Sequence, residues 1–311
     1  MRKDLISIAD LSASELLSIF KLSSQIKKAP QKYSNALRGK SIALIFEKQS
    51  LRTHVTFEIG AKQLGAHTVY LTNADISLGK RESIYDVTKN LERWVDAVVI
   101  RTYDHQNLEL MAQIGSLSVI NALTDFEHPC QAIGDFFTII EHFKTIKKKK
   151  FAWIGDGNNV CHSLMLTAAK LGMNFTAATP ANYLPDPKII ELAREEGKRT
   201  KAEIVITNDP VEGATNADVI YTDVWISMGQ EQNRDSKMKA FLNYQVNTDL
   251  MKHGKPTAVF MHCLPAHRGE EVTDDVIDSP QSIVFEQAEN RLHTQKAILA
   301  TLLKGKRKSK R

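Results

Sequence analysis

The sequence predicts an α/β protein with two similar-sized domains, each built on a parallel sheet, and a ligand-binding cleft between them. The chain has 311 residues, which is the length of about two ordinary domains. Short apolar runs alternate with amphipathic stretches along the chain, and this βαβ pattern is typical of parallel sheets covered on both faces. Charged residues make up 25% and hydrophobic residues 42% of the chain, so the composition is that of a globular protein and excludes whole-chain disorder.

The first half of the chain contains four short apolar runs separated by amphipathic segments. The predicted strands are Ser41–Phe46, Thr68–Leu71, Ala97–Ile100 and Ser118–Asn121. The predicted helices between them are Val55–Leu64, Ser83–Trp94 and Leu108–Ile114. A longer helix, Gln131–Phe143, follows and leads to a solvated lysine run, Lys147–Lys150, that we expect to join the two halves.

The second half repeats the same alternation. The predicted strands are Phe151–Ile154, Phe175–Ala178, Glu203–Ile206, Val219–Tyr221 and Ala258–Met261. Leu164, Ala168 and Leu171 have the spacing of a helical core stripe, and Lys188–Arg194 and Glu289–Leu303 are further predicted helices. We therefore expect one domain over residues 1–146, joined by the helix at about 289–303, and a second over residues 147–288.

The last eight residues form a basic tail. Six of them are Lys or Arg, so the rest of the chain has 35 basic against 36 acidic residues and is nearly neutral. A basic tail can bind nucleic acid, but this one has no aromatic residue for base stacking. We expect residues 304–311 to be a disordered, solvated end and expect no nucleic-acid partner.

Composition also indicates the compartment. The chain has 3 cysteines, no apolar run near the ~20 residues of a membrane span and an N-terminus interrupted by Asp4 and Asp10, which does not resemble a secretory signal. We therefore expect a cytoplasmic protein with no membrane partner. The cysteines and histidines lack the spaced pairs of a structural zinc site, so no metal is expected.

A candidate phosphate site follows the first strand. In the segment Phe46–His54, Ser50 and Thr53 are potential helix caps, and Arg52 has a planar guanidinium suited to phosphate oxygens. The first turn of a helix offers free backbone N–H groups and partial positive charge. A plain helix cap beside a solvated arginine is an equally good interpretation of these residues alone.

Two later strand ends also carry polar residues. Arg101 follows Val98–Ile100, where an ordinary loop arginine is the simpler interpretation. His128 and Gln131 flank Pro129, and they could bind a carbonyl oxygen and an amide or only shape a turn.

The segment Gly155–Val160 occupies the position of a dinucleotide-binding loop, but Val160 replaces the third glycine of that motif. The next strand also lacks the acidic residue that binds a ribose hydroxyl. A nicotinamide-dependent oxidoreductase is therefore disfavoured. Asn158 and Asn159 instead offer amide groups suited to a carboxylate.

Asp223 and Cys263 follow two other predicted strands. Asp223 and the Ser227–Gly229 turn could bind an α-ammonium group, although a surface loop is a reasonable alternative. Cys263 could be reactive, but most buried cysteines are inert. A thiol hydrolase would need a histidine base such as His262 or His267, and adjacent residues on extended backbone point to opposite faces, which argues against a Cys263–His262 pair.

Taken together and in this order, the motifs resemble those of the ornithine carbamoyltransferases of the aspartate/ornithine carbamoyltransferase superfamily. The resemblance extends from about residue 4 to about residue 303 and rests on these segments: Phe46–Lys48, Ser50–Thr53, Arg101, His128–Gln131, Gly155–Asn159, Asp223–Gly229, His262–Pro265 and Glu289–Arg291. It implies two α/β domains with an active-site cleft between them, a cytoplasmic homotrimer or multiple of trimers, and no metal or organic cofactor. The substrates that it implies are carbamoyl phosphate and L-ornithine, as in arginine biosynthesis.

The resemblance also implies roles for single residues. The residues that would bind carbamoyl phosphate are Ser50, Leu51 through its backbone, Arg52, Thr53, Arg101, His128, Gln131, Cys263, Leu264 and Arg291. Those that would bind ornithine are Asn159, Asp223, Ser227 and Met228. Of these, Cys263, Arg101 and His128 would be catalytic, with Cys263 near the attacking amine.

The sequence departs from the family pattern at two places. The phosphate loop of the family commonly reads Ser-Thr-Arg-Thr-Arg, whereas this chain has Leu51 and His54 at the second and fifth positions. Relatives often have a longer polar residue where this chain has Ser77, so Lys80 or Arg81 is an alternative for reaching a neighbouring subunit's phosphate.

The main alternatives are sister enzymes. Cys263 and the Ser-Met-Gly turn disfavour an aspartate carbamoyltransferase. Putrescine has no carboxylate and acetylornithine no α-ammonium, so the Asp223 and Ser-Met-Gly arrangement favours ornithine over both, which remain the alternative substrates.

Overall fold

The computed structural model describes residues 3–227, 229, 232 and 234–303. These residues divide into two compact units: a first unit of residues 3–137 and 289–303, and a second unit of residues 138–288. The predicted tail at 304–311 and Met228 lie outside the described residues. Within the described part of the chain, no helix has the length and apolar character that crossing a membrane requires.

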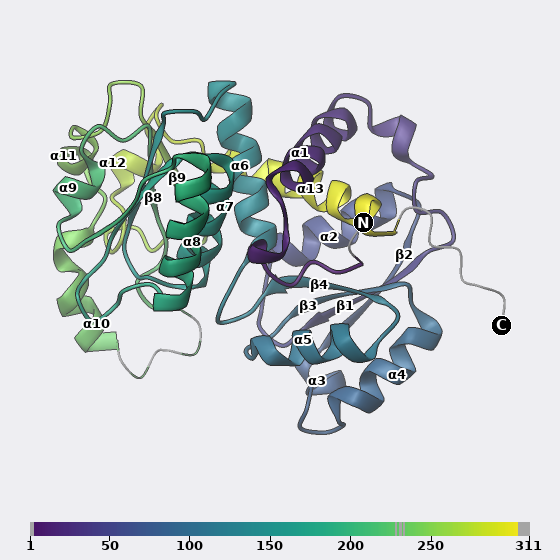
Figure 1. The fold of residues 1–311 in the computed structure, drawn as a ribbon. Coiled ribbons are helices and arrows are strands. Elements are labelled where there is room, and N and C mark those ends of the chain that lie inside the picture. The colour runs from purple at the N-terminus through teal and green to yellow at the C-terminus, as the bar shows by residue number, and fades with distance from the viewer. Residues whose placement is uncertain (1–2, 228, 230–231, 233, 304–311) are drawn as a thin grey trace. The chain divides into compact units, whose positions relative to one another are not determined.

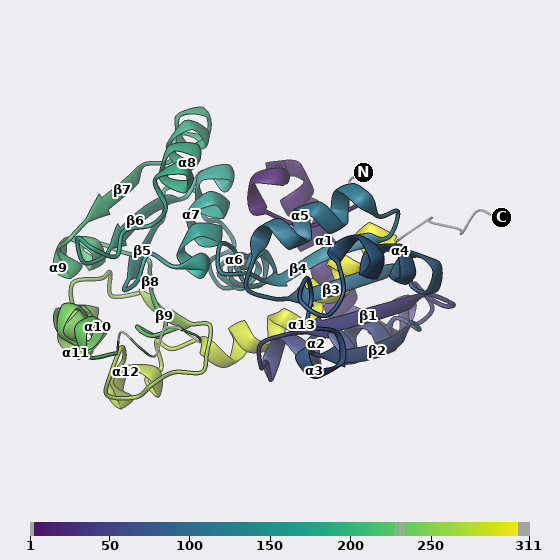
Figure 2. The same ribbon diagram turned by 90° about the horizontal axis from the view of Figure 1, so that it is seen from below.

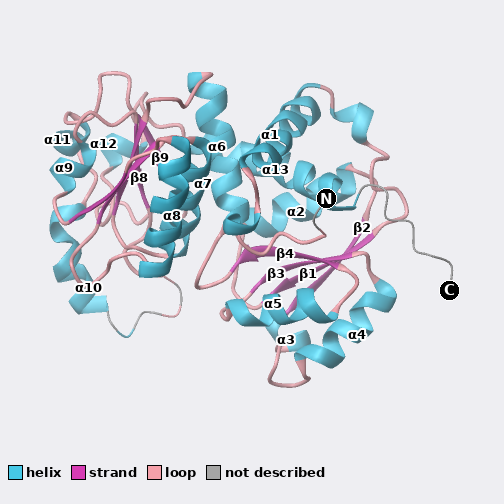
Figure 3. Ribbon diagram, in the orientation of Figure 1, coloured by secondary structure: helices cyan, strands magenta, loops and turns pink. Residues whose placement is uncertain are grey.

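The first unit is built on a parallel sheet with the strand order β2-β1-β3-β4 (Figures 1 and 3). The strands are β1 (Ser41–Phe46), β2 (His67–Thr72), β3 (Ala97–Arg101) and β4 (Ser118–Leu123). Phe46 pairs with both Thr72 and Arg101, so these strands end at one common edge. Polar residues that follow these strands are thereby brought to the same edge.

Helices cover both faces of this sheet (Figure 1). Its helices are α1 (Ala13–Lys28), α2 (Arg52–Gln63), α3 (Asn73–Ile76), α4 (Ile84–Trp94), α5 (His105–Ile114), the start of α6 (Pro129–Phe143) and most of α13 (Val284–Leu303), with short 3-10 turns at Ile8–Asp10 and Pro30–Tyr33. Ala43 and Ile45 share one buried cluster with residues of α4 and α5. On α2, a Cβ at Gly60 would lie 3.1 Å from the side chain of Lys296 on α13, so these two helices pack closely.

The second unit has the parallel strand order β7-β6-β5-β8-β9 (Figure 2). Its strands are β5 (Lys150–Ile154), β6 (Asn174–Ala178), β7 (Ile204–Thr207), β8 (Val219–Thr222) and β9 (Val259–His262). Its helices are α7 (Asn159–Leu171), α8 (Pro187–Thr200), α9 (Pro210–Ala214), α10 (Arg234–Phe241), α11 (Thr248–Met251) and α12 (Asp274–Ile277), with a 3-10 turn at Leu242–Tyr244. Residues of α9 to α12 share a buried cluster with Ile154, Ile220 and Phe260 of the sheet, and Figure 2 shows α7 and α8 on the other side.

Every predicted strand is present, with ends shifted by at most two residues, so the fold class is confirmed. The helix predictions need four corrections of length, because α2 begins at Arg52, α5 begins at His105, α8 continues to Thr200 and α13 begins at Val284. Helix α1 was missed, although its capping box between Ser12 and Glu15 is visible in the sequence. The division near residue 146 stays a prediction.

Candidate active site

The phosphate loop of the first unit connects β1 to α2. Leu51 is the N-cap of α2 and makes no side-chain capping bond, and its side chain is 72% exposed. The expectation that Ser50 or Thr53 caps the helix is therefore wrong. Ser50 and Arg52 are half-buried, and because no side chain caps the first turn, its amides and the helix dipole favour an anion there.

Arg291 connects the start of α2 to α6. It is 2% exposed, its Nη2 donates to Thr53 Oγ1 at 2.8 Å and its Nη1 donates to Gln131 Oε1. Gln131 donates in turn from Nε2 to Asp135 Oδ1 at 2.7 Å. Three residues predicted from separate motifs, Thr53, Gln131 and Arg291, are thus held in one buried network.

His128 and Arg101 lie beside this network. Both are buried, at 4% and 7% exposure. Burial holds the pKa of His128 well below its usual value, and the charges of Arg291 and Arg101 lower it further. His128 is therefore neutral near pH 7 and can serve as a hydrogen-bond donor without adding charge.

Acid should destabilise the fold through His128. The pKa of His128 is lower in the folded than in the unfolded chain. At pH values below the ordinary histidine pKa of about 6.5, the folded chain therefore binds fewer protons than the unfolded chain. Stability should then fall as the pH falls through about 6.5 and on toward the lowered pKa of the folded state, with this one group contributing up to about 1.4 kcal/mol per pH unit. We expect His128→Gln to reduce that slope in urea unfolding, and His67→Gln, at an exposed histidine, to leave it unchanged; equal slopes in wild type and His128→Gln would refute the prediction.

Cys130 is packed into the same region but is not a candidate nucleophile. Its Sγ donates to the carbonyl of Asn121 at 3.3 Å, and burial raises the pKa of its thiol to about 12. A thiol with that pKa is inert near pH 7.

Glu47 and Lys48 support the loop, although the motif Phe46–Lys48 alone predicts no separate role for them. Glu47 accepts hydrogen bonds from the Leu78 N–H at 2.9 Å and from the Thr102 hydroxyl. Lys48 is buried and pairs with Asp125. The signal that could have identified them is the occurrence of two adjacent charged residues directly after the buried run Ile42–Phe46.

The two departures from the family pattern have partners of their own. His54 stacks on Tyr70 with 3.8 Å between ring centroids, and its Nε2 lies 3.0 Å from Glu58 Oε2. Ser77 donates to the carbonyl of Asn73 at 2.7 Å. Among the alternatives to Ser77, Arg81 donates to the carbonyl of Asp75 at 3.2 Å, and Lys80 is exposed.

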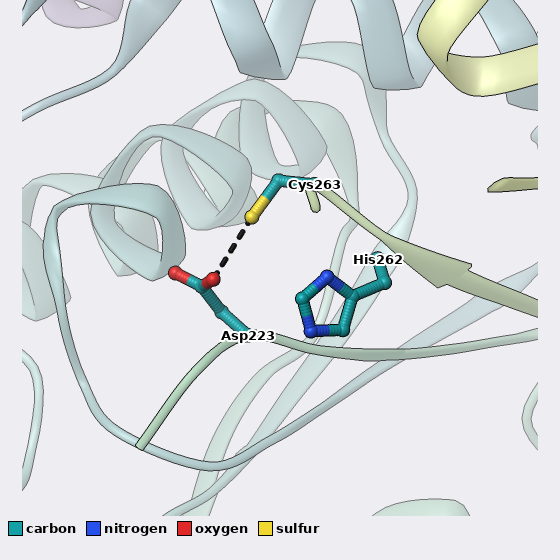
Figure 4. Close-up of side chains that lie close together, drawn as sticks. All are labelled: Asp223, His262 and Cys263. Atoms are coloured by element: carbon teal, nitrogen blue, oxygen red, sulfur yellow. Dashed lines mark hydrogen bonds between the residues drawn. The ribbon is translucent and has the colours of Figure 1, made fainter. Parts of the chain in front are cut away.

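Asp223 is the centre of the candidate site in the second unit. It follows β8, and its Oδ1 accepts a hydrogen bond from Cys263 Sγ at 2.9 Å (Figure 4). Its Oδ2 accepts from Asn158 Nδ2 at 2.8 Å. The structure therefore brings together a carboxylate, a thiol and an amide that the sequence placed after three different strands.

His262 positions the residues that follow β9. Its Nδ1 accepts from the Leu264 N–H at 2.8 Å, so Nε2 carries the proton and faces Glu271 Oε1 at 3.2 Å. Leu264 has a positive φ of 58°, which a leucine adopts only where its surroundings impose it. His262 and Cys263 thus hydrogen-bond to different residues, and His262 shapes the turn at Leu264.

The remaining predicted residues lie near the same loops. Asn158 is the N-cap of α7 and accepts from the N–H groups of Val160 and Cys161. Asn159 begins α7 and is half-buried, as is Ser227. Met228 was predicted beside Ser227 but lies outside the described residues.

Among the described residues, two groups of side chains have potential metal-ligand atoms within 4.8 Å of one another: Asp223 with His262 and Cys263, and His267 with Glu270 and Glu271. In the first group, the hydrogen bonds of His262 to Leu264 and Glu271 occupy both ring nitrogens. A metal at this position would have to displace one of them.

The fold and the site define a class of two-unit α/β proteins with an anion-binding helix start in one unit and a carboxylate–thiol pair in the other. Two family models match the chain: the carbamoyl-phosphate-binding domain of aspartate/ornithine carbamoyltransferase over residues 3–141, and its aspartate/ornithine-binding domain over residues 147–302. The chain belongs to the aspartate/ornithine carbamoyltransferase family.

Individual relatives agree with this assignment. The chain is 48% identical over 305 residues to the ornithine carbamoyltransferase of Thermococcus kodakarensis, covering 97% of both chains, and 48% identical to the anabolic ornithine carbamoyltransferase of Pyrococcus furiosus. The solved structure of ornithine carbamoyltransferase from Pyrococcus furiosus superposes with a TM-score of 0.95 over 98% of each chain. That of the anabolic enzyme from Campylobacter jejuni superposes with a TM-score of 0.92 at 35% identity, covering 97% of this chain and 99% of that one.

Proposed function

We propose that this protein is an ornithine carbamoyltransferase, which transfers the carbamoyl group of carbamoyl phosphate to the side-chain amine of ornithine to give citrulline and phosphate. The observation that carries the choice of ornithine is the hydrogen bond between Cys263 and Asp223. A single carboxylate surrounded by neutral donors suits a substrate with an α-ammonium group. The relatives named ornithine carbamoyltransferase, at 48% identity over most of the chain, support the same choice.

The first unit binds carbamoyl phosphate in this proposal. Ser50, the Leu51 and Thr53 amides and Arg52 hold the phosphate at the start of α2. Arg52 contributes two parallel N–H donors to phosphate oxygens. The position of Leu51 is consistent with a purely backbone contribution, because its side chain is exposed and makes no capping bond.

The carbamoyl end is held by Arg101, His128 and Gln131. Arg101 and neutral His128 stabilise the negative charge that develops on the carbamoyl oxygen as the amine attacks. Arg291 keeps Gln131 and Thr53 in place through its two hydrogen bonds. The donors are fixed before the substrate arrives, which lowers the cost of organising them during the reaction.

The second unit binds ornithine. Asp223 pairs with the α-ammonium, and Asn159, Ser227 and Met228 bind the neighbouring polar groups. Cys263 lies near the attacking amine, and the Cys263–Leu264 turn contributes to the binding of carbamoyl phosphate. His262 and Glu271 hold this turn in position through the Leu264 N–H.

The reaction then needs no covalent enzyme intermediate. The free amine of ornithine has a pKa like that of lysine, about 10.4, and a site with several cationic neighbours lowers it. The neutral nitrogen attacks the carbamoyl carbon, a C–N bond forms, and the bond from that carbon to the phosphate oxygen breaks. The nitrogen gives up one proton to the departing phosphate, which leaves toward Arg52. Positioning and electrostatic stabilisation therefore account for the rate.

We further propose a cytoplasmic homotrimer, or a multiple of trimers. Exposed apolar residues at i, i+4 and i+8 follow one face of α2 (Leu51, Val55 and Ile59), and β2 adds Val69 and Tyr70, all at least 39% exposed. Apolar residues exposed in one chain and grouped on neighbouring elements favour burial against another copy. Sedimentation velocity measures the assembly directly, and a monomer at working concentration would contradict it.

A carbamoylation assay tests the substrate. Carbamoyl phosphate is paired separately with ornithine, acetylornithine, putrescine and aspartate, and both phosphate release and ureido product are measured. We expect a clear preference for ornithine. A preference for putrescine or acetylornithine would keep the phosphate side of the proposal and overturn the roles of Asp223 and Ser227.

The binding of carbamoyl phosphate should be weaker here than in a variant with arginine at position 54, because His54 stands where relatives have a fixed positive charge. The Nε2 of His54 lies 3.0 Å from Glu58 Oε2, so an arginine at this position would share its charge with that carboxylate. We therefore expect His54→Arg to lower KM for carbamoyl phosphate by only about two- to fivefold. An equal KM in both proteins would contradict the prediction.

A further inference from the structure

Lys237 is a buried cation on an otherwise exposed turn of helix α10. Its side chain is 7% exposed, whereas Arg234, Asp235, Ser236 and Lys239 are exposed. Removing an ammonium group from water is costly unless it is paired and hydrogen-bonded. The contacts of Lys237 show what compensates for this cost.

The ammonium of Lys237 joins two loops. Its Nζ donates to Asp156 Oδ2 at 2.6 Å and to the carbonyl of Trp225 at 3.2 Å. Asp156 belongs to the β5–α7 loop and Trp225 to the segment that follows β8. The Tyr183 ring adds a cation–π contact, with 5.3 Å from Nζ to the ring centroid.

Both loops carry residues of the amino-acid half of the site. Asp156 is two residues before Asn158, which donates to Asp223. Trp225 lies two residues after Asp223 and two before Ser227. One ammonium group therefore fixes the spacing between the loop that supplies Asn158 and the loop that supplies Asp223 and Ser227.

Lys237 also compensates for the charge of one of two neighbouring carboxylates, Asp156 and Asp223. Asp156 is buried, and its pKa is raised chiefly by that burial and further by the nearby charge of Asp223. The ion pair with Lys237 compensates for Asp156. Within the residues that the structure describes, the side-chain donors to Asp223 are the neutral Asn158 and Cys263, so the negative charge of Asp223 is left for a cationic group of a ligand.

We infer that Lys237 is a positioning residue for the amino-acid substrate: it ties Asp156 to the Trp225 carbonyl and so holds Asn158, Asp223 and Ser227 in the arrangement that binds the α-amino end. This inference rests on the proposed function. It predicts an effect on the amino-acid substrate, because the residues that Lys237 ties together, Asp156 and Trp225, belong to the second unit.

The test compares Lys237→Met, Lys237→Arg and the double variant Asp156→Asn/Lys237→Met with wild type. Lys239→Met, at an exposed lysine two residues along the same helix, is the matched control. We expect Lys237→Met to raise KM for ornithine at least about tenfold, with KM for carbamoyl phosphate changed less than about twofold. A tenfold change corresponds to about 1.4 kcal/mol. Lys237→Arg should recover part of the affinity, and Lys239→Met should resemble wild type.

The double variant distinguishes positioning from mere compensation of a buried charge. It leaves no unpaired carboxylate, so its Tm should return toward that of wild type, while KM for ornithine stays high because the tie to Trp225 is absent. Recovery of both quantities would overturn the inference, as would an unchanged ornithine KM in Lys237→Met or an equal rise in both KM values. If Lys237→Met does not fold, the double variant and Lys237→Arg supply the same comparison.

The proposed function can fail separately. A wild-type protein that carbamoylates another amine and not ornithine would refute it, whatever the variants do. The same ratio of KM values is then measured with that amine, and an amine KM that does not change in Lys237→Met would still overturn the positioning role.

Discussion

Arg52→Ala is expected to lower kcat/KM for carbamoyl phosphate by about 10³-fold while the protein stays folded. Two charge-assisted hydrogen bonds to phosphate, at about 2 kcal/mol each, are lost together, and about 4 kcal/mol corresponds to about three orders of magnitude in rate. Arg52 is half-buried at the first position of α2, so truncating it does not open a large cavity. The loss should appear in both kcat and KM, because Arg52 holds the substrate phosphate and also stabilises the departing phosphate.

The variant Arg52→Lys distinguishes the effect of the positive charge of Arg52 from the effect of its planar donor geometry. Arg52→Lys retains the charge but not the planar pair of donors, so we expect an intermediate loss. Arg38→Ala, at an exposed arginine elsewhere in the first unit, controls for the general removal of positive charge. Near-full turnover by a folded Arg52→Ala protein, measured by phosphate release under saturating ornithine, would refute the proposed phosphate site.

The sequence is sufficient to predict the sheets but not all helices. Runs such as Ile42–Phe46 are apolar at every position because this part of the strand is buried on both faces, and this pattern needs no knowledge of distant residues. Helix α1 has polar residues between its core positions and was missed. Helix α13 begins at Val284 rather than Glu289, and the residue before it is the buried, apolar Ile283, which is not one of the residue types that mark a helix start in a sequence.

The same holds for the site: local motifs identify its residues, but contacts between residues far apart in the chain decide which of them meet. Each motif marks residues at the end of one strand, so Arg101, His128, Asp223 and Cys263 could be proposed from the sequence. Which of them touch depends on the register of strands far apart in the chain. The bond from Arg291 to Thr53 spans 238 positions. Thr53 does not cap α2 because it is the second residue of the helix, after Arg52. Helical spacing predicts a contact only between neighbours along one helix. The partner of Lys237 lies 81 positions away, so this contact could not be predicted from the sequence pattern either.

Asp223→Asn is expected to raise KM for ornithine by about 100-fold or more and to leave KM for carbamoyl phosphate nearly unchanged. The substitution keeps the size of the side chain but removes the charge that pairs with the α-ammonium. Removing one partner of a partly buried charge pair costs about 2–5 kcal/mol, and about 3 kcal/mol is already more than a hundredfold in affinity. Asp249→Asn, at an exposed aspartate of the same unit whose side chain is 85% exposed, is the control for removing one negative charge.

An inhibitor without the side-chain amine shows which end of ornithine Asp223 contacts. L-Norvaline has the α-ammonium and carboxylate of ornithine but no attacking nitrogen, so its inhibition constant reports only on the α-amino end. If Asp223 pairs with the α-ammonium, this constant rises in Asp223→Asn by about as much as KM for ornithine. If Asp223 acts instead on the side-chain amine through Cys263, at 2.9 Å from its Oδ1, norvaline binds both proteins equally well and kcat falls. The second result would move Asp223 from substrate binding to proton transfer, because its hydrogen bond to Cys263 links it to the residue proposed to lie near the reacting nitrogen.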